Sequence, residues 1–172
     1  NRDEIVAALE RFEIDFAITG RPPESFPVER EVIGDHPHVV IAAPDHPLVG
    51  RPALPLQALA DETFLLREPG SGTRALVDAL RAEAGLDAQA GMELGSNETI
   101  KQAVMAGMGI ALLSAHTIEA ELRDGRLAAL DVEGLPVVRR WYVIRRRERR
   151  LLLPTAQALW DFIAHESGRL LP

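Results

Sequence analysis

Apolar residues along the chain alternate between helical spacing and short continuous runs. Ile5 and Leu9 recur at helical spacing near the start of the 172-residue chain, where Asn1 and Glu4 form a variant of the capping box. The nearly continuous apolar run at 14–18 then predicts a buried parallel strand. A helix followed by a buried strand is typical of α/β proteins.

The same alternation continues to the end of the chain. Further strands are predicted at residues 28–33, 39–43, 64–66, 91–94, 110–113, 127–132 and 137–144. Helices are predicted at residues 56–60, between Ser71 and Gly85, from Ser96 with Met108 on its inward face, between Ser114 and Leu122, and from Pro154 onward. Strands that alternate with helices predict an α/β fold with parallel sheets.

The one complete alternating block lies in the middle of the chain, which predicts two lobes joined by two crossovers. We expect residues 44–132 to form lobe II, and residues 1–43 together with 133–172 to form lobe I. Lobe I then begins with a helix and lacks the strand that should precede it in a βαβ unit. A helix that simply packs on the sheet is the alternative interpretation.

Composition narrows the classes of function. The net charge of −7 argues against a nucleic-acid-binding surface, and the 5% aromatic content argues against stacking on single strands. The absence of cysteine excludes disulfides and thiolate metal sites. No run approaches the roughly 18 apolar residues of a membrane span, and no signal peptide is visible in a chain that opens on Asn1. We therefore expect a soluble protein.

The strongest local feature joins a predicted strand to a predicted helix: Arg67-Glu68-Pro69-Gly70-Ser71-Gly72-Thr73-Arg74. Its glycines allow a tight turn, Ser71 can cap the helix, and free N–H groups at a helix start make a candidate anion site. The spacing and the missing lysine exclude a P-loop, while Pro69 and Thr73 exclude a nucleophile elbow. An ordinary capped turn is the alternative.

A second turn of this kind leads into the next helix: Gly95-Ser96-Asn97-Glu98-Thr99. Ligands of open α/β sheets bind outside the carboxyl ends of the strands, so both helix starts can face one crevice. The positive charges of Arg67, Arg74 and Lys101 favour a phosphorylated or multiply carboxylated metabolite as the ligand. Plain capping by Ser96 is the alternative interpretation.

Other polar residues carry weaker indications. His36 and His38 share a strand face, but no acidic residues are grouped around them, so we expect no metal site. A basic cluster near the C-terminus favours a solvated strand end with local ion pairs over nucleic-acid binding: Arg139, Arg140, Arg145, Arg146, Arg147, Arg149 and Arg150. No serine, histidine and carboxylate are spaced as a catalytic group, so we expect neither an enzyme nor a cofactor.

Several segments, in this order, resemble the effector-binding domain of LysR-type transcriptional regulators. They are residues 1–9 and 13–18, Pro44-Asp45-His46-Pro47-Leu48, the 67–74 turn, Ser96-Asn97-Glu98, and residues 104–113. Residues 17–24 and 32–38 also resemble the subgroup that controls carbon-fixation operons. Thr19 departs from that pattern, where a bulkier apolar residue such as methionine is expected.

The resemblance implies a two-lobed fold like that of periplasmic binding proteins, without the first strand, helix and second strand of lobe I. It implies an upstream winged helix-turn-helix domain that contacts promoter DNA, and an effector that enters between the lobes and shifts their angle. It adds Thr19 and Gly20 to the candidate effector site. The implied assembly is a cytoplasmic homodimer or homotetramer.

Two other classes share this scaffold: periplasmic solute-binding proteins and enzymes. Fold alone does not separate them from the regulator. An upstream signal peptide would favour the transporter protein, and an upstream helix-turn-helix would favour the regulator.

Overall fold

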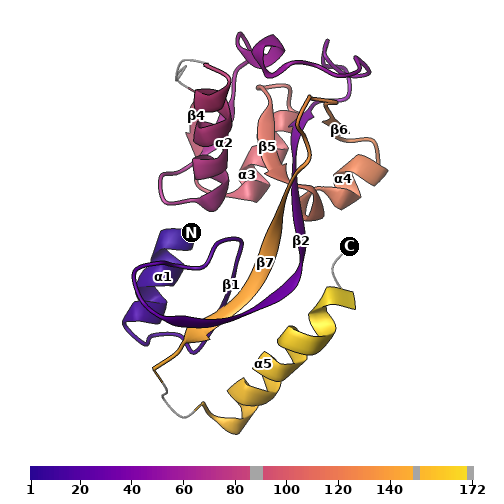
Figure 1. Ribbon diagram of the computed structural model, residues 1–172. Helices are drawn as coiled ribbons and strands as arrows, with labels where there is room; N and C mark the ends of the chain where they lie inside the picture. Colours follow the sequence, from indigo (N-terminus) through magenta and orange to yellow (C-terminus); the bar gives the residue numbers. More distant parts are fainter. Residues whose placement is uncertain (86–90, 149–151, 170–172) are drawn as a thin grey trace. The chain divides into compact units, whose positions relative to one another are not determined.

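The computed structural model describes residues 1–85, 91–148 and 152–169, and the chain divides into two compact units (Figure 1). Unit 1 comprises residues 1–36 and the segment from 139 onward, and unit 2 comprises residues 37–138. The changeovers lie within two long strands, β2 (Val28–Ala42) and β7 (Val137–Arg146). The unit boundaries lie at 36/37 and 138/139. The lobe boundaries predicted at 43/44 and 132/133 stay a prediction.

Unit 1 is built on a sheet in which the short strand β1 (Ala17–Thr19) pairs antiparallel with β7, which in turn lies beside β2. The neighbouring β7 residues Val143 and Ile144 point to opposite faces, as in any strand. Ile144 packs with Leu9 of helix α1 (Arg2–Glu10), and Val143 packs with Trp160 of helix α5 (Pro154–Glu166). The two helices therefore cover opposite faces of this sheet. The short 3₁₀ helix η3 (Ser167–Arg169) follows α5.

The local signals at the two helix starts of unit 1 are confirmed. Asn1 accepts hydrogen bonds from the backbone N–H groups of Asp3 and Glu4, and the Glu4 side chain closes the capping box. Pro154 is the first residue of α5, where its missing N–H costs no hydrogen bond.

One strand prediction in unit 1 is wrong, and two further strand predictions are confirmed but merge into a single strand. The run at 14–18 is not a buried parallel strand, because β1 begins only at Ala17 and pairs antiparallel, while Ile14 and Ile18 are exposed. The predicted strands at 28–33 and 39–43 are one strand, β2. Pro37 lies inside β2 and does not end the strand.

Unit 2 contains the predicted parallel pair, β3 (Leu65–Arg67) with β4 (Met92–Leu94). Helix α2 (Gly72–Glu83) follows β3, and helix α3 (Asn97–Met105) follows β4. The other strands, β5 (Ala111–Ser114) and β6 (Ala128–Ala129), pair antiparallel with β2, so the expectation of a wholly parallel sheet is wrong. The remaining helical segments are short: η1 (Leu56–Leu59), η2 (Ala115–Thr117) and α4 (Glu119–Arg123).

Two apolar clusters hold unit 2 together. One includes Val40, Phe64 and Leu112, and the other includes Ile100 and Leu113. Because Leu112 and Leu113 are adjacent in β5, the clusters lie on its two faces. Burial of each such side chain contributes about 1.5–3 kcal/mol, which keeps β3, β4 and their helices in place.

Three local predictions in unit 2 are wrong. Met108 is 47% exposed, because α3 ends at Met105 and Gly107 turns the chain with a φ of 73°. The Ser114 side chain makes no cap hydrogen bond, because a 3₁₀ turn separates it from α4. The predicted strand 127–132 shortens to two residues. In the described part of the chain, no helix is long and apolar enough to cross a membrane.

Candidate functional site

The two predicted turns lie at one edge of the β3–β4 pair. In a parallel pair the carboxyl ends of both strands meet at the same edge, and the register sets Arg67 opposite Leu94. The Arg67 guanidinium crosses this edge, where its Nη1 donates a hydrogen bond of 2.6 Å to Oδ1 of Asn97. One side chain therefore ties the turn before α2 to the first residue of α3.

The arginines of the first turn are occupied by partners within unit 2. Arg67 donates a two-pronged pair of bonds to Glu68, at 2.7 and 2.8 Å, and both side chains are largely buried. Arg74 donates to the backbone oxygen of Arg67 at 3.1 Å and binds Asp78 at 3.0 Å and Glu93 at 3.5 Å. These bonds fix the shape of the turn and neutralise its positive charge.

The start of α2 offers neutral hydrogen-bonding groups. Ser71 is the N-cap residue, yet its side chain makes no cap hydrogen bond, so the expectation that Ser71 caps α2 is wrong. Ser71 is buried, and only its backbone oxygen bonds into the helix, accepting from the N–H of Ala75. Among the described residues, no group bonds the hydroxyl of Thr73. Together with Gly72, these residues form the positive end of a twelve-residue helix.

The start of α3 is different, because Ser96 does cap it. The Ser96 hydroxyl accepts from the N–H of Thr99 at 3.1 Å and lies 2.8 Å from the Thr99 hydroxyl. The predicted cap is confirmed, so the structure uses the Ser96 side chain within the helix itself.

Lys101 and its carboxylates form a compact ionic group. Its ammonium lies 2.9 Å from both Glu98 and Glu121, and the side chains of Lys101 and Glu121 are only 11% and 9% exposed. Burial opposes the Lys101 charge, but the two hydrogen-bonded carboxylates outweigh it and raise the pKa. The hydrogen bond from Lys101 lowers the pKa of Glu121. Lys101 therefore ties α3 to α4.

Thr19 and Gly20 belong to unit 1, not to the unit of the two turns. Thr19 is buried, and its hydroxyl accepts from the N–H of Arg21 at 3.4 Å and lies 3.2 Å from the Arg21 backbone oxygen. A Cβ on Gly20 would lie 3.0 Å from the His36 ring, which stacks on Trp141 at 3.6 Å between centroids. Only a residue without a side chain fits this position unless His36 shifts.

The other polar residues of the sequence analysis are found in separate places. His36 and His38 are both buried but belong to different units, and the described residues contain no group of metal-ligating side chains. The prediction of local ion pairs in the basic cluster is confirmed for Arg140 with Asp35, Arg145 with Glu29, and Arg146 with Glu148. Arg149 and Arg150 lie outside the described residues.

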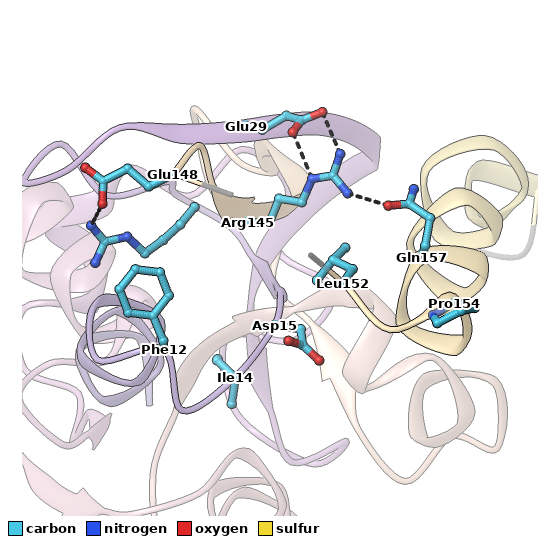
Figure 2. A pocket seen from close by; sticks show the side chains of 10 residues that line it. Phe12, Ile14, Asp15, Glu29, Arg145, Glu148, Leu152, Pro154 and Gln157 are labelled. Carbon is cyan, nitrogen blue, oxygen red and sulfur yellow. Dashed lines mark hydrogen bonds and ion pairs between the residues drawn. The ribbon is translucent and has the colours of Figure 1, made fainter. Parts of the chain in front are cut away.

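Unit 1 also contains a pocket of about 520 Å³ that the sequence analysis did not predict (Figure 2). Two arginines of the lining bind lining carboxylates: Arg145 binds Glu29 at 2.8 and 2.9 Å, and Arg146 binds Glu148 at 2.6 Å. Arg145 also donates to Gln157 at 3.1 Å. These residues come from distant parts of the chain, so no local motif signals them. The lining residues are Phe12, Ile14, Asp15, Glu29, Arg145, Arg146, Glu148, Leu152, Pro154 and Gln157.

Comparison with known proteins gives consistent matches over the whole chain. It is 52% identical to the HTH-type transcriptional regulator CbbR of Xanthobacter flavus, over 100% of this chain and 52% of that protein. It is 45% identical to the RuBisCO operon transcriptional regulator of Allochromatium vinosum, over 99% of this chain and 56% of that protein. The chain thus spans about half the length of these relatives.

A solved structure extends the likeness to three dimensions. The CcmR regulatory domain of Synechocystis PCC6803, in complex with 2-PG, is 40% identical with a TM-score of 0.88, over 95% of this chain and 78% of that chain. The predicted fold class is therefore confirmed as that of LysR-type regulatory domains, with its two-lobed, periplasmic-binding-protein-like architecture. The LysR substrate binding domain family matches residues 1–168, and the chain belongs to this family as an effector-binding domain of LysR-type regulators.

Proposed function

We propose that this domain senses a small phosphorylated or multiply carboxylated metabolite and thereby controls transcription of carbon-fixation genes. The observation that carries the proposal is the similarity to the CcmR regulatory domain bound to 2-PG. The relatives named for CbbR and for the RuBisCO operon support the choice of target genes. These relatives are transcription regulators, so we propose binding without turnover for this domain as well.

The effector contacts that we propose fall into two groups. The neutral groups are Ser71, Gly72 and Thr73 at the start of α2, Ser96 and Asn97 at the start of α3, and Thr19 with Gly20 in unit 1. Arg67, Glu68, Arg74, Glu98 and Lys101 stay candidates for contact, but their ion pairs first hold the turns in shape. The two groups differ in that the second consists of charged side chains that form ion pairs within unit 2.

The rest of the regulator follows from the relatives, which are about twice as long as this chain. We propose that promoter DNA is bound by a winged helix-turn-helix domain outside these residues, in a homodimer or homotetramer. Effector binding would then act by shifting the population between two arrangements of that assembly. A regulator of this kind acts in the cytoplasm, where the promoter lies.

Calorimetric titration of the protein with 2-PG tests the proposal. We expect saturable binding of 2-PG, and no heat from a neutral sugar such as glucose at the same concentration. Binding heat from glucose but not from 2-PG, or from neither compound, would contradict the proposed effector class.

A further inference from the structure

Two buried hydroxyl groups of unit 2 have no hydrogen-bond partner among the described residues. Ser71, which precedes α2, is 5% exposed, and Ser114, the last residue of β5, is 4% exposed. The Oγ atom of Ser114 is fully buried and unbonded, although His38 lies opposite it in β2. A buried hydroxyl without a partner costs free energy, so folded proteins usually supply one. Two such groups in one unit point to a ligand that bonds them.

Both hydroxyls lie at the same edge of the strands of unit 2. Phe64 and Ile110 form a parallel bridge directly before β3 and β5, and β3 pairs in parallel with β4. The carboxyl ends of these three strands therefore meet at the edge described above for the two turns. Ser114 ends β5 at this edge, and Ser71 follows the end of β3 by four residues. Ligands of open α/β sheets bind outside such an edge.

Strand alternation directs Ser114 toward the start of α2. Leu112 of β5 packs in the same apolar cluster as Val77 of α2, and both side chains line one small apolar cavity. Ser114 points to the same face as Leu112 and lies about 6.6 Å closer to the edge, at about 3.3 Å per residue. Because α2 runs back along the strands from this edge, Ser71 lies about 9 Å closer to it than Val77, at about 1.5 Å per residue. The two hydroxyls therefore approach the first turn of α2 from neighbouring elements.

The first turn of α2 adds further hydrogen-bond donors. In the described part of the chain, no group accepts from the backbone N–H groups of Thr73 and Arg74, and none bonds the Thr73 hydroxyl. These N–H groups stand at the positive end of the helix dipole. At the start of α3, by contrast, the Ser96 hydroxyl already accepts from the N–H of Thr99. Neutral donors therefore gather at the start of α2.

We propose that Ser71, Thr73 and Ser114, with the N–H groups of Thr73 and Arg74, bind the phosphate group of the effector. A phosphate monoester offers three acceptor oxygens in different directions, whereas a carboxylate offers two in one plane. Donors that come from a strand end and from a helix start suit the phosphate group, and helix N-termini bind phosphate well. This inference rests on the proposed function; it adds Ser114 to the site and names the chemical group that is recognised.

Recognition by neutral donors leaves the ion pairs of unit 2 in place. Arg67 keeps its pair with Glu68, and the side chain of Arg74 keeps its pair with Asp78. An anion bound by either guanidinium group would instead have to displace these carboxylates. The hydroxyl groups and the helix dipole thus supply the attraction to phosphate at the start of α2.

The amide signals of Thr73 and Arg74 report on this site directly. We titrate the ¹⁵N-labelled protein with 2-PG, inorganic phosphate and citrate, which carries carboxylates but no phosphate, and follow these two signals by NMR. We expect 2-PG and inorganic phosphate to shift both signals in a saturable way. Citrate should bind here at least about tenfold more weakly than 2-PG, because a carboxylate engages fewer of the donors.

Ser71→Ala and Ser114→Ala test the two buried hydroxyls. We expect each to weaken the binding of 2-PG and inorganic phosphate about tenfold to a hundredfold, the usual range for a lost hydrogen bond to a charged group. Ser71→Thr keeps a hydroxyl and should recover part of the affinity. The matched control is Ser167→Ala, which removes a hydroxyl that donates to the backbone oxygen of Ile163 in unit 1 and should leave both affinities unchanged.

Stability separates recognition from a structural role. Each alanine removes a buried hydroxyl that no described group bonds, so the melting temperature of the unliganded protein should not fall. A lower melting temperature with unchanged affinities for Ser71→Ala and Ser114→Ala would show that the hydroxyls serve the fold, and would overturn the site. Binding of 2-PG by the same variants would still support the proposed function.

The three ligands separate the remaining outcomes. If inorganic phosphate binds through Ser71 and Ser114 but 2-PG does not bind at all, the phosphate site stands and the proposed effector fails. Citrate that shifts the amide signals of Thr73 and Arg74 as tightly as 2-PG overturns the choice of phosphate. Absence of binding by all three ligands to the parent protein overturns both the site and the proposed function.

Discussion

At the scale of single residues, Thr73 and Ser96 stand in similar places but have different bonds. Ser96 uses its hydroxyl to cap α3, whereas the Thr73 hydroxyl has no partner among the described residues. Two hydroxyl side chains at strand-to-helix turns therefore differ in what they bond. The local sequence cannot separate these roles, because a capping hydroxyl and a ligand-binding hydroxyl have the same chemistry.

We predict that Thr73→Ala weakens 2-PG binding about tenfold to a hundredfold while the free energy of unfolding changes by less than about 0.5 kcal/mol. Calorimetric titration and chemical denaturation of the same preparation measure both quantities. Thr155→Ala is the matched control, because Thr155 holds the second position of α5 as Thr73 does of α2. Equal 2-PG affinities for Thr73→Ala and Thr155→Ala would remove Thr73 from the effector site.

Ser96→Ala should lower the free energy of unfolding by about 1 kcal/mol, since the N–H of Thr99 loses its acceptor. Ser96→Asp restores a capping oxygen and should recover most of this loss. Urea denaturation of the three proteins provides the comparison. An alanine variant as stable as the parent would show that the cap contributes nothing.

At the scale of secondary-structure elements, the ion pair between Lys101 and Glu121 joins α3 to α4. Lys101→Met leaves the buried Glu121 carboxylate without its main partner, and we expect a loss of about 1–3 kcal/mol at pH 7. Denaturation midpoints against those of Arg123→Met, an exposed control on α4, measure this loss. A loss no larger than that of the control would mean that the pair does not stabilise the fold.

The same pair predicts a pH dependence. The folded-state pKa of Glu121 lies below its ordinary value of 4.5, so its stabilising contribution is complete above that pH and is lost as the pH falls through the folded value. The stability gap between the parent protein and Lys101→Met should therefore shrink below about pH 4.5. A gap that stays constant from pH 7 down to pH 3 would contradict this assignment.

At the scale of the whole molecule, net charge bears on whether the 172-residue chain can bind DNA by itself. With a net charge of −7 and a length about half that of its relatives, the chain should show no sequence-specific DNA binding. A mobility-shift titration of a carbon-fixation promoter with the 172-residue chain tests this prediction. The positive control is the same chain fused to an upstream helix-turn-helix domain. A sequence-specific shift produced by the 172-residue chain alone would refute the proposal that a separate domain binds the promoter.

Much of the architecture could be predicted from local sequence. The capping box at Asn1, the proline start of α5, and the order of β3, α2, β4 and α3 follow from spacing and from residues whose backbone preferences are strong. The turns at 67–74 and 95–99 are also visible locally, because glycine and hydroxyl residues stand between an apolar strand pattern and a helical pattern. Family membership adds the two-lobed fold to this account.

Only the tertiary structure decided which groups have charged partners. Arg67 meets Asn97 across thirty residues of sequence, Lys101 meets Glu121 across twenty, and Arg145 meets Glu29 across 116. Strand direction was decided in the same way, since β1 and β5 are antiparallel although their apolar runs suit either direction. The physical reason is that backbone preference and capping act over a few residues, whereas strand pairing and electrostatic pairing depend on groups that meet only after the chain has folded.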